Sequence, residues 1–98
     1  MKLEWLDASD AAQFGTALAR FYIGRMPLDV DKTDKKFGNK KDFVAKKMLE
    51  QVDQFKLESK LNIYKKAKLG NAFKWTLKEA GYADEEVDQL TGTLMRQL

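Results

Sequence analysis

The residues with the clearest capacity for chemistry lie between Glu58 and Glu79. This stretch contains no carboxylate, and it carries the aromatic rings of Tyr64, Phe73 and Trp75. Its six lysines are Lys60, Lys65, Lys66, Lys68, Lys74 and Lys78. Ammonium groups beside aromatic rings suit an anionic polymer, because the charges attract it and the rings pack against it. The sequence therefore predicts a binding surface in this stretch.

The composition leaves few side chains for catalysis. The 98 residues include no cysteine and no histidine, which removes disulfides, thiolate chemistry and the commonest general base and metal ligand. Ser9 and Ser59 are the only serines, so a hydrolase triad cannot be assembled. The six glycines stand singly, so no phosphate-binding loop is present. We expect a protein that is not an enzyme, with no catalytic residue and no cofactor.

The acidic segment 29–34 resembles part of a calcium-binding loop. Oxygen donors stand at its first, third and fifth positions, but Asp34 replaces the glycine required at the sixth. Lys40 replaces the glutamate required at the twelfth. We therefore expect a solvated acidic turn and no metal site.

Charge is distributed unevenly along the chain, whose formal net charge is +3. Residues 1–31 carry −2, residues 32–78 carry +9 with fourteen lysines, and residues 79–98 carry −4. The acidic ends could neutralise the basic middle within the fold, or the middle could face a partner. No arginine occurs between Lys32 and Lys78. Nucleic-acid binding by this region would therefore be salt-sensitive and poor in sequence preference.

Apolar spacing predicts an all-α protein, a small four-helix bundle-like single domain over residues 1–98. The helices are expected at about 10–25, 41–60, 63–80 and 84–98, with a polar loop at about 26–39 that ends in the turn Gly38-Asn39. The predicted core stripe of the second helix is Val44, Ala45, Met48, Leu49, Val52 and Phe55. The predicted core face of the third helix is Ile63, Ala67, Gly70, Phe73, Leu77 and Ala80.

Polar residues at the expected helix ends predict how the helices start and stop. Asp10 and Gln13 have the spacing of a capping box for the first helix. Asp84 is the expected cap of the fourth helix. Asn62 is expected to stop or cap the end of the second helix, and Gly81 to be the C′ residue of the third.

The third helix has a second face that combines rings, lysines and an amide. At 100° per residue, most of these side chains fall within about 80° of one another, opposite much of the predicted core face. The rings would anchor a partner, and the lysines would raise its rate of association. The predicted partner-binding residues are Tyr64, Lys65, Lys68, Asn71, Trp75 and Lys78.

Two functions and one structural alternative follow from this face. The first is a protein-interaction module whose partner is an acidic protein. The second is weak, nonspecific binding of nucleic acid, RNA or single strands, by the same residues. In the structural alternative Tyr64 and Trp75 pack against another helix or the N-terminal segment, which would remove both anchors. A homodimer that pairs the basic middle of one chain with an acidic end of another is a further alternative.

Hydropathy gives no sign of a membrane protein. The N-terminal residues lack the apolar run of a signal peptide. No stretch approaches the roughly 18 apolar residues that would suggest a membrane span. We expect a small soluble, cytoplasmic domain with no membrane partner.

Overall fold

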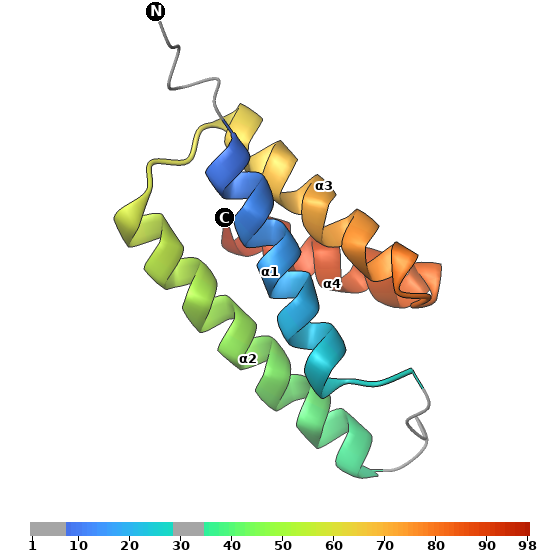
Figure 1. Ribbon diagram of the computed structural model, residues 1–98. Coiled ribbons are helices and arrows are strands. Elements are labelled where there is room, and N and C mark those ends of the chain that lie inside the picture. Colours follow the sequence, from blue (N-terminus) through green and yellow to red (C-terminus); the bar gives the residue numbers. More distant parts are fainter. Residues whose placement is uncertain (1–7, 29–34) are drawn as a thin grey trace, which may run out of the picture.

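The structure, a computed structural model, describes residues 8–28 and 35–98. It contains the helices α1 (Ser9–Arg25), α2 (Lys35–Glu58), α3 (Ile63–Glu79) and α4 (Asp84–Gln97), and the described residues form no strand (Figure 1). The predicted all-α, four-helix fold is confirmed.

Helix α1 occupies the centre of the arrangement. It packs most extensively on α3 and also contacts α2, while α4 contacts both α3 and α2. In Figure 1, α1 runs between α2 and α3, and α4 crosses behind it. One side of α3 is thus covered by α1 and α4, and this covering determines which of its residues remain on the surface.

All four helices contribute to one cluster of buried apolar side chains. Tyr22 and Phe73 are the largest fully buried side chains. The others of this group are Leu18, Met26, Leu69, Leu77, Leu94, Val44, Val52 and Val87. Burying an apolar side chain of this size contributes about 1.5–3 kcal/mol, so the cluster fixes the helices relative to one another.

The crossing of α1 and α3 is unusually close at Gly15. A Cβ atom added there would overlap the carbonyl oxygen of Leu69 and would lie 3.2 Å from the Cβ of Ala72. Ala11 and Ala19, one turn before and after, are fully buried. This row of small residues lets the two helix backbones approach, which fixes the rotation of α3 about its own axis.

The expected polar loop at about 26–39 is too long, because α2 begins at Lys35 and includes Gly38 and Asn39. Phe37 is half-buried and packs against the core cluster. This apolar contact outweighs the helix penalty of Gly38, which is about 1 kcal/mol. The acidic turn expected at 29–34 lies outside the described residues.

The end of α3 follows the sequence prediction, whereas Asn62, expected to end the second helix, instead caps the start of α3, four residues after α2 ends at Glu58. The side-chain oxygen of Asn62 accepts a hydrogen bond of 2.8 Å from the backbone N–H of Lys65 and so caps the helix. At the other end, Gly81 has φ 100°. Its N–H donates to Lys78 O (3.0 Å) and the N–H of Tyr82 donates across the turn (3.3 Å), which is a Schellman ending.

The predicted caps of α1 and α4 are wrong. The N-cap residues are Ala8 and Ala83, and neither helix start has a side-chain cap. Asp10 is the second residue of α1 and Asp84 is the first residue of α4. The Asp10 carboxylate accepts a hydrogen bond from the adjacent N–H of Ala11 (2.9 Å). The charges of Asp10 and Asp84 still favour the positive ends of the helix dipoles.

The predicted core face of α3 is only partly right. Gly70, Phe73 and Leu77 are buried as expected. Ile63 is 87% exposed and Ala67 is also exposed, while Leu69, which the prediction left out, is fully buried. The contact with α1 at Gly15 explains the difference, since it rotates α3 so that Leu69 faces the core.

Candidate functional site

The predicted binding residues lie on the side of α3 that α1 and α4 leave uncovered. Phe73 and Leu77 are fully buried, whereas Tyr64 is 42% and Trp75 is 54% exposed. The two rings therefore do not pack into the core or beneath another helix. The N-terminal segment, the other contact in the structural alternative, lies outside the described residues. We call Tyr64, Lys65, Lys68, Asn71, Trp75 and Lys78 the α3 outer face.

Each exposed ring of the α3 outer face has a lysine beside it. The Nζ of Lys68 lies 5.6 Å from the centroid of the Tyr64 ring. The Nζ of Lys78 lies 5.3 Å from the centroid of the Trp75 ring. Cation–π contacts of this kind contribute about 0.5–1 kcal/mol at exposed sites. They hold a positive charge next to an apolar surface, which is the combination that the sequence predicted.

The remaining contacts of the face leave most of its charge available. Lys68 and Asn71 are exposed, and Lys65 is half-buried at the edge of the face. Lys78 pairs with Asp84 at 4.0 Å, an exposed contact of small energy. Among the described residues, neither Lys65 nor Lys68 forms an ion pair. The charge that is free to meet a partner therefore lies mainly in the first half of α3.

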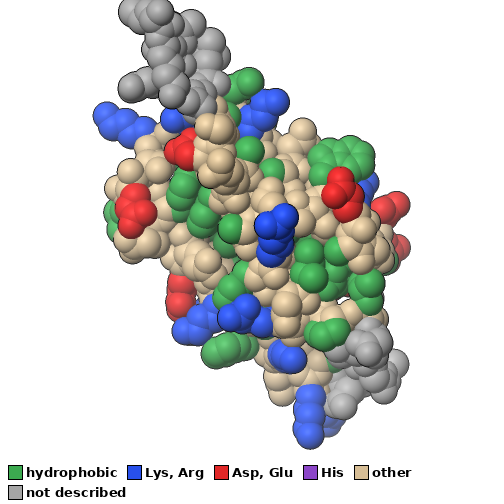
Figure 2. All heavy atoms as spheres, in the orientation of Figure 1, with side chains coloured by type: hydrophobic (Ala, Val, Ile, Leu, Met, Phe, Trp, Pro, Cys, Tyr) green, Lys and Arg blue, Asp and Glu red, His purple; other side chains and the backbone are tan. Residues whose placement is uncertain are grey.

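Similar pairs of a ring and a cation occur on other helices. Phe43 of α2 is 60% exposed, with the Nζ of Lys47 at 5.5 Å from its centroid. Lys47 also pairs with Glu50 at 3.4 Å, so the charge of this pair is compensated. On the face drawn in Figure 2, hydrophobic side chains reach the surface at several places near lysine or arginine side chains. The α3 outer face differs because Lys68 has no acidic neighbour bound to it.

An open groove adjoins the α3 outer face at the start of α3. Its volume is about 780 Å³. The residues that line it are Leu61, Asn62, Ile63, Tyr64, Lys66 and Ala67. Tyr64 belongs to both the groove and the face. Sequence reasoning missed the groove because it assigned Ile63 and Ala67 to the core. The only signal in the sequence was the number of apolar residues near the junction of the two helices, since Leu57, Leu61 and Ile63 are more than one core stripe needs.

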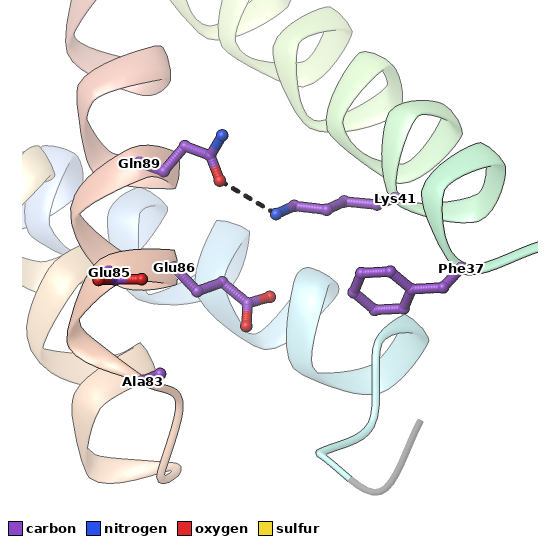
Figure 3. A pocket seen from close by; sticks show the side chains of 6 residues that line it. All are labelled: Phe37, Lys41, Ala83, Glu85, Glu86 and Gln89. Carbon is purple, nitrogen blue, oxygen red and sulfur yellow. Dashed lines mark hydrogen bonds between the residues drawn. The ribbon is translucent and has the colours of Figure 1, made fainter. Parts of the chain in front are cut away.

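A second hollow of about 530 Å³ lies between the starts of α2 and α4 (Figure 3). The residues that line it are Phe37, Lys41, Ala83, Glu85, Glu86 and Gln89. The Nζ of Lys41 donates a hydrogen bond of 3.2 Å to Gln89 Oε1 across it, as drawn in Figure 3. The buried hydroxyl of Tyr22 donates to Glu86 Oε2. These contacts join α2 and α1 to α4, so the polar groups of this hollow serve the fold.

Two buried tyrosines belong to the same structural network. Burial, and secondly the hydrogen bond to Glu86, raise the pKa of Tyr22 above its ordinary value. Burial raises the pKa of Tyr82, with a smaller contribution from the charge of Glu86. The Tyr82 hydroxyl donates to the carbonyl oxygen of Met26, and its ring meets that of Tyr22 edge-on at 5.6 Å. Both hydroxyls thus remain protonated donors that hold the end of α1.

Two further kinds of feature are absent from residues 8–28 and 35–98. No three histidine, cysteine, aspartate or glutamate side chains come together as metal ligands there. No helix of these ranges is both long enough and apolar enough to cross a membrane.

The fold and the site define a small all-α protein whose third helix presents exposed rings and lysines. No protein-family model, curated protein or solved structure matches the chain. The α3 outer face is therefore the feature of the described residues that bears on function.

Proposed function

We propose that this protein is a non-enzymatic interaction module that binds an acidic segment of another protein through the α3 outer face. The observation that carries the proposal is the exposure of Tyr64 and Trp75, each with a lysine Nζ within 6 Å of its ring. A cytoplasmic location, as the sequence leads us to expect, is part of the same proposal.

The two rings and the lysines have different roles in this mechanism. Tyr64 and Trp75 lie eleven residues apart, or about 16 Å along the helix axis. Large aromatic side chains at such positions are the usual anchors of protein interfaces, because a partner can exclude water from them. Lys65 and Lys68 would attract the acidic segment and raise its association rate more than its final affinity.

Nucleic acid is the less favoured partner for a physical reason. Asp84 lies beside Lys78 at the C-terminal end of the face, and the exposed carboxylate of Glu79 follows directly. A phosphate chain laid along the whole face would meet these charges. An acidic protein segment can instead place an apolar side chain on Trp75 and confine its carboxylates to the first half of α3.

A fluorescence titration separates these partners. In a W5F variant Trp75 is the only tryptophan and reports directly on the face. The probes are an 18-residue glutamate-rich peptide with a leucine stripe and a 12-nucleotide single-stranded RNA, each at about 50 and 200 mM salt. We expect the peptide to change the Trp75 emission and to keep binding at the higher salt.

Two comparisons make the result decisive. Lys68→Gln should weaken peptide binding, whereas Lys47→Gln, at the matched pair on α2, should not. A response to the RNA that collapses by more than about tenfold at the higher salt, without a response to the peptide, would overturn the proposal in favour of nucleic acid.

A further inference from the structure

The groove at the start of α3 has the lining of a site for an apolar side chain. Leu61, Ile63, Tyr64 and Ala67 supply most of its surface, and Ile63 is 87% exposed. Single exposed apolar residues are common on proteins, but here the exposed Ile63, Tyr64 and Ala67 line one open hollow of about 780 Å³ together with the half-buried Leu61. Water in such a hollow is displaced favourably by a bulky aliphatic or aromatic group.

Among the described residues that line the groove and the hollow next to it, every charged side chain is a lysine. Lys66 is part of its wall, and a smaller adjoining hollow of about 280 Å³ shares Leu61 and Lys66 with it and adds Lys56 and Lys60. No carboxylate occurs between Glu58 and Glu79, and the first turn of α3 contains no acidic residue. The charge around the groove is therefore complementary to an acidic partner.

The start of α3 is held by two hydrogen bonds, so the backbone that carries Ile63 and Tyr64 is fixed before a partner binds. Asn62 caps the helix through the N–H of Lys65 at 2.8 Å, and its own carbonyl oxygen accepts from the N–H of Lys66 at 3.0 Å. A site that is formed before binding costs its partner less conformational entropy.

The groove continues directly into the α3 outer face through Tyr64. A partner helix lying along α3 would meet the groove at one end and Trp75 about 16 Å farther on. In the partner, this distance corresponds to apolar residues at positions i and i+11, with i+4 and i+7 between them on the same side. Its acidic residues would then border this stripe and lie near Lys65 and Lys68.

We infer that the partner segment is an acidic amphipathic helix, one of whose apolar side chains enters the groove of Leu61, Ile63, Tyr64 and Ala67. This inference rests on the proposed function and adds the groove as its specificity-determining part. Charge attracts the helix, and the groove selects a segment that has a bulky apolar residue at the correct position.

The test uses two peptides of identical composition. Both have 18 residues; the first places leucine at i, i+4, i+7 and i+11 among glutamates, and the second has the same residues in an order without an apolar face. Each is titrated into the protein and into Ile63→Ala. Leu57→Ala is the matched control, because Leu57 is 82% exposed but does not line the groove. Alanine favours the helix at position 63, so the variant should fold.

The expected result is that the amphipathic peptide binds about tenfold more tightly than its isomer. Ile63→Ala should weaken binding of the amphipathic peptide by about fivefold or more and leave the affinity for the isomer unchanged. Leu57→Ala should change neither affinity. Equal binding of both peptides, unaffected by Ile63→Ala but weakened by Lys68→Gln, would overturn the groove inference and leave the proposed function standing. Failure of both peptides to bind would overturn both proposals.

A third probe separates a protein partner from a membrane surface. Vesicles with about 30% anionic lipid offer negative charge and an apolar interior without a helical stripe. Suppose that the native protein binds these vesicles, that Ile63→Ala abolishes this binding, and that the amphipathic peptide does not compete with it. The groove then serves a lipid surface, and the inference is wrong.

Discussion

Replacement of Gly15 by alanine tests the contact that sets the rotation of α3. The added Cβ would overlap the carbonyl oxygen of Leu69, would lie 3.1 Å from its carbonyl carbon, and would lie 3.2 Å from the Cβ of Ala72. The first two are backbone atoms, which cannot turn aside as the end of a flexible side chain can. The two helices must therefore move apart by about 1 Å to restore ordinary contact distances.

The size of the effect follows from two opposing contributions. Overpacking a close interface costs about 1–3 kcal/mol, and the upper end applies because no side chain can yield. Alanine recovers about 1 kcal/mol of helix propensity relative to glycine. We therefore expect Gly15→Ala to lower the free energy of unfolding by about 2 kcal/mol, or the Tm by about 10 °C for a domain of this size.

Urea unfolding followed by far-ultraviolet circular dichroism measures this difference. The matched control is Gly24→Ala in the same helix, where an added Cβ has no atom within 4 Å. The control should be as stable as the native protein or more stable by about 0.5 kcal/mol. If Gly15→Ala is as stable as Gly24→Ala, the close crossing of α1 and α3 is wrong, and with it our account of why the α3 outer face is exposed.

Three further predictions concern the cap, the buried tyrosine and the exposed rings. Asn62→Ala should cost about 1 kcal/mol in urea unfolding, and Asn62→Asp, which keeps an acceptor, should restore most of it. Because burial and the bond to Glu86 raise the pKa of Tyr22 above 10.0, the unfolded chain loses this proton first as pH rises. Stability due to this group is therefore intact below about pH 10 and falls above it by up to about 1.4 kcal/mol per pH unit. Tyr22→Phe should reduce the slope of stability against pH in urea unfolding between about pH 9 and 11 and leave the part that is due to Tyr82, whose pKa is also raised; an unchanged slope would contradict the assignment. Trp75→Ala and Phe43→Ala should each lower the free energy of unfolding by about 1 kcal/mol or less, because both rings are more than half exposed and each loses one cation–π contact. A loss above about 1.5 kcal/mol for Trp75→Ala would show that its ring supports the core.

The helices were predictable where apolar spacing and end signals agree. Val44, Met48 and Val52 are buried as the stripe of α2 requires, and Gly81 marks the end of α3 as its chemistry suggests. These features depend on residues close together in the sequence, which is why local patterns contain them.

The errors arose where contacts between residues far apart in the sequence determine the structure. The start of α2 was placed too late because Gly38 indicates a turn locally, while Phe37 gains a contact with the core that only the folded chain provides. The core face of α3 was rotated toward Ile63 because the close approach of Gly15 to Leu69 joins residues more than fifty positions apart. The groove was missed because of the same error.

The candidate face was easier to predict than the groove. Tyr64, Lys68 and Trp75 share one side of a helix whose other side is apolar, so their common position follows from helical geometry. Their exposure depends on how α1 and α4 cover α3. Local sequence patterns do not show how these helices pack.

The most direct measurement for the central claim is an amide-shift titration of isotope-labelled protein with the acidic amphipathic peptide at about 150 mM salt. If the α3 outer face binds the peptide, the amide chemical shifts should change from Leu61 to Lys78. The changes should be largest near Tyr64 and Trp75, and the amides around Phe43 on α2 should be unchanged. Shifts centred on the hollow between α2 and α4, or no shift on α3 at saturating peptide, would contradict binding by this face.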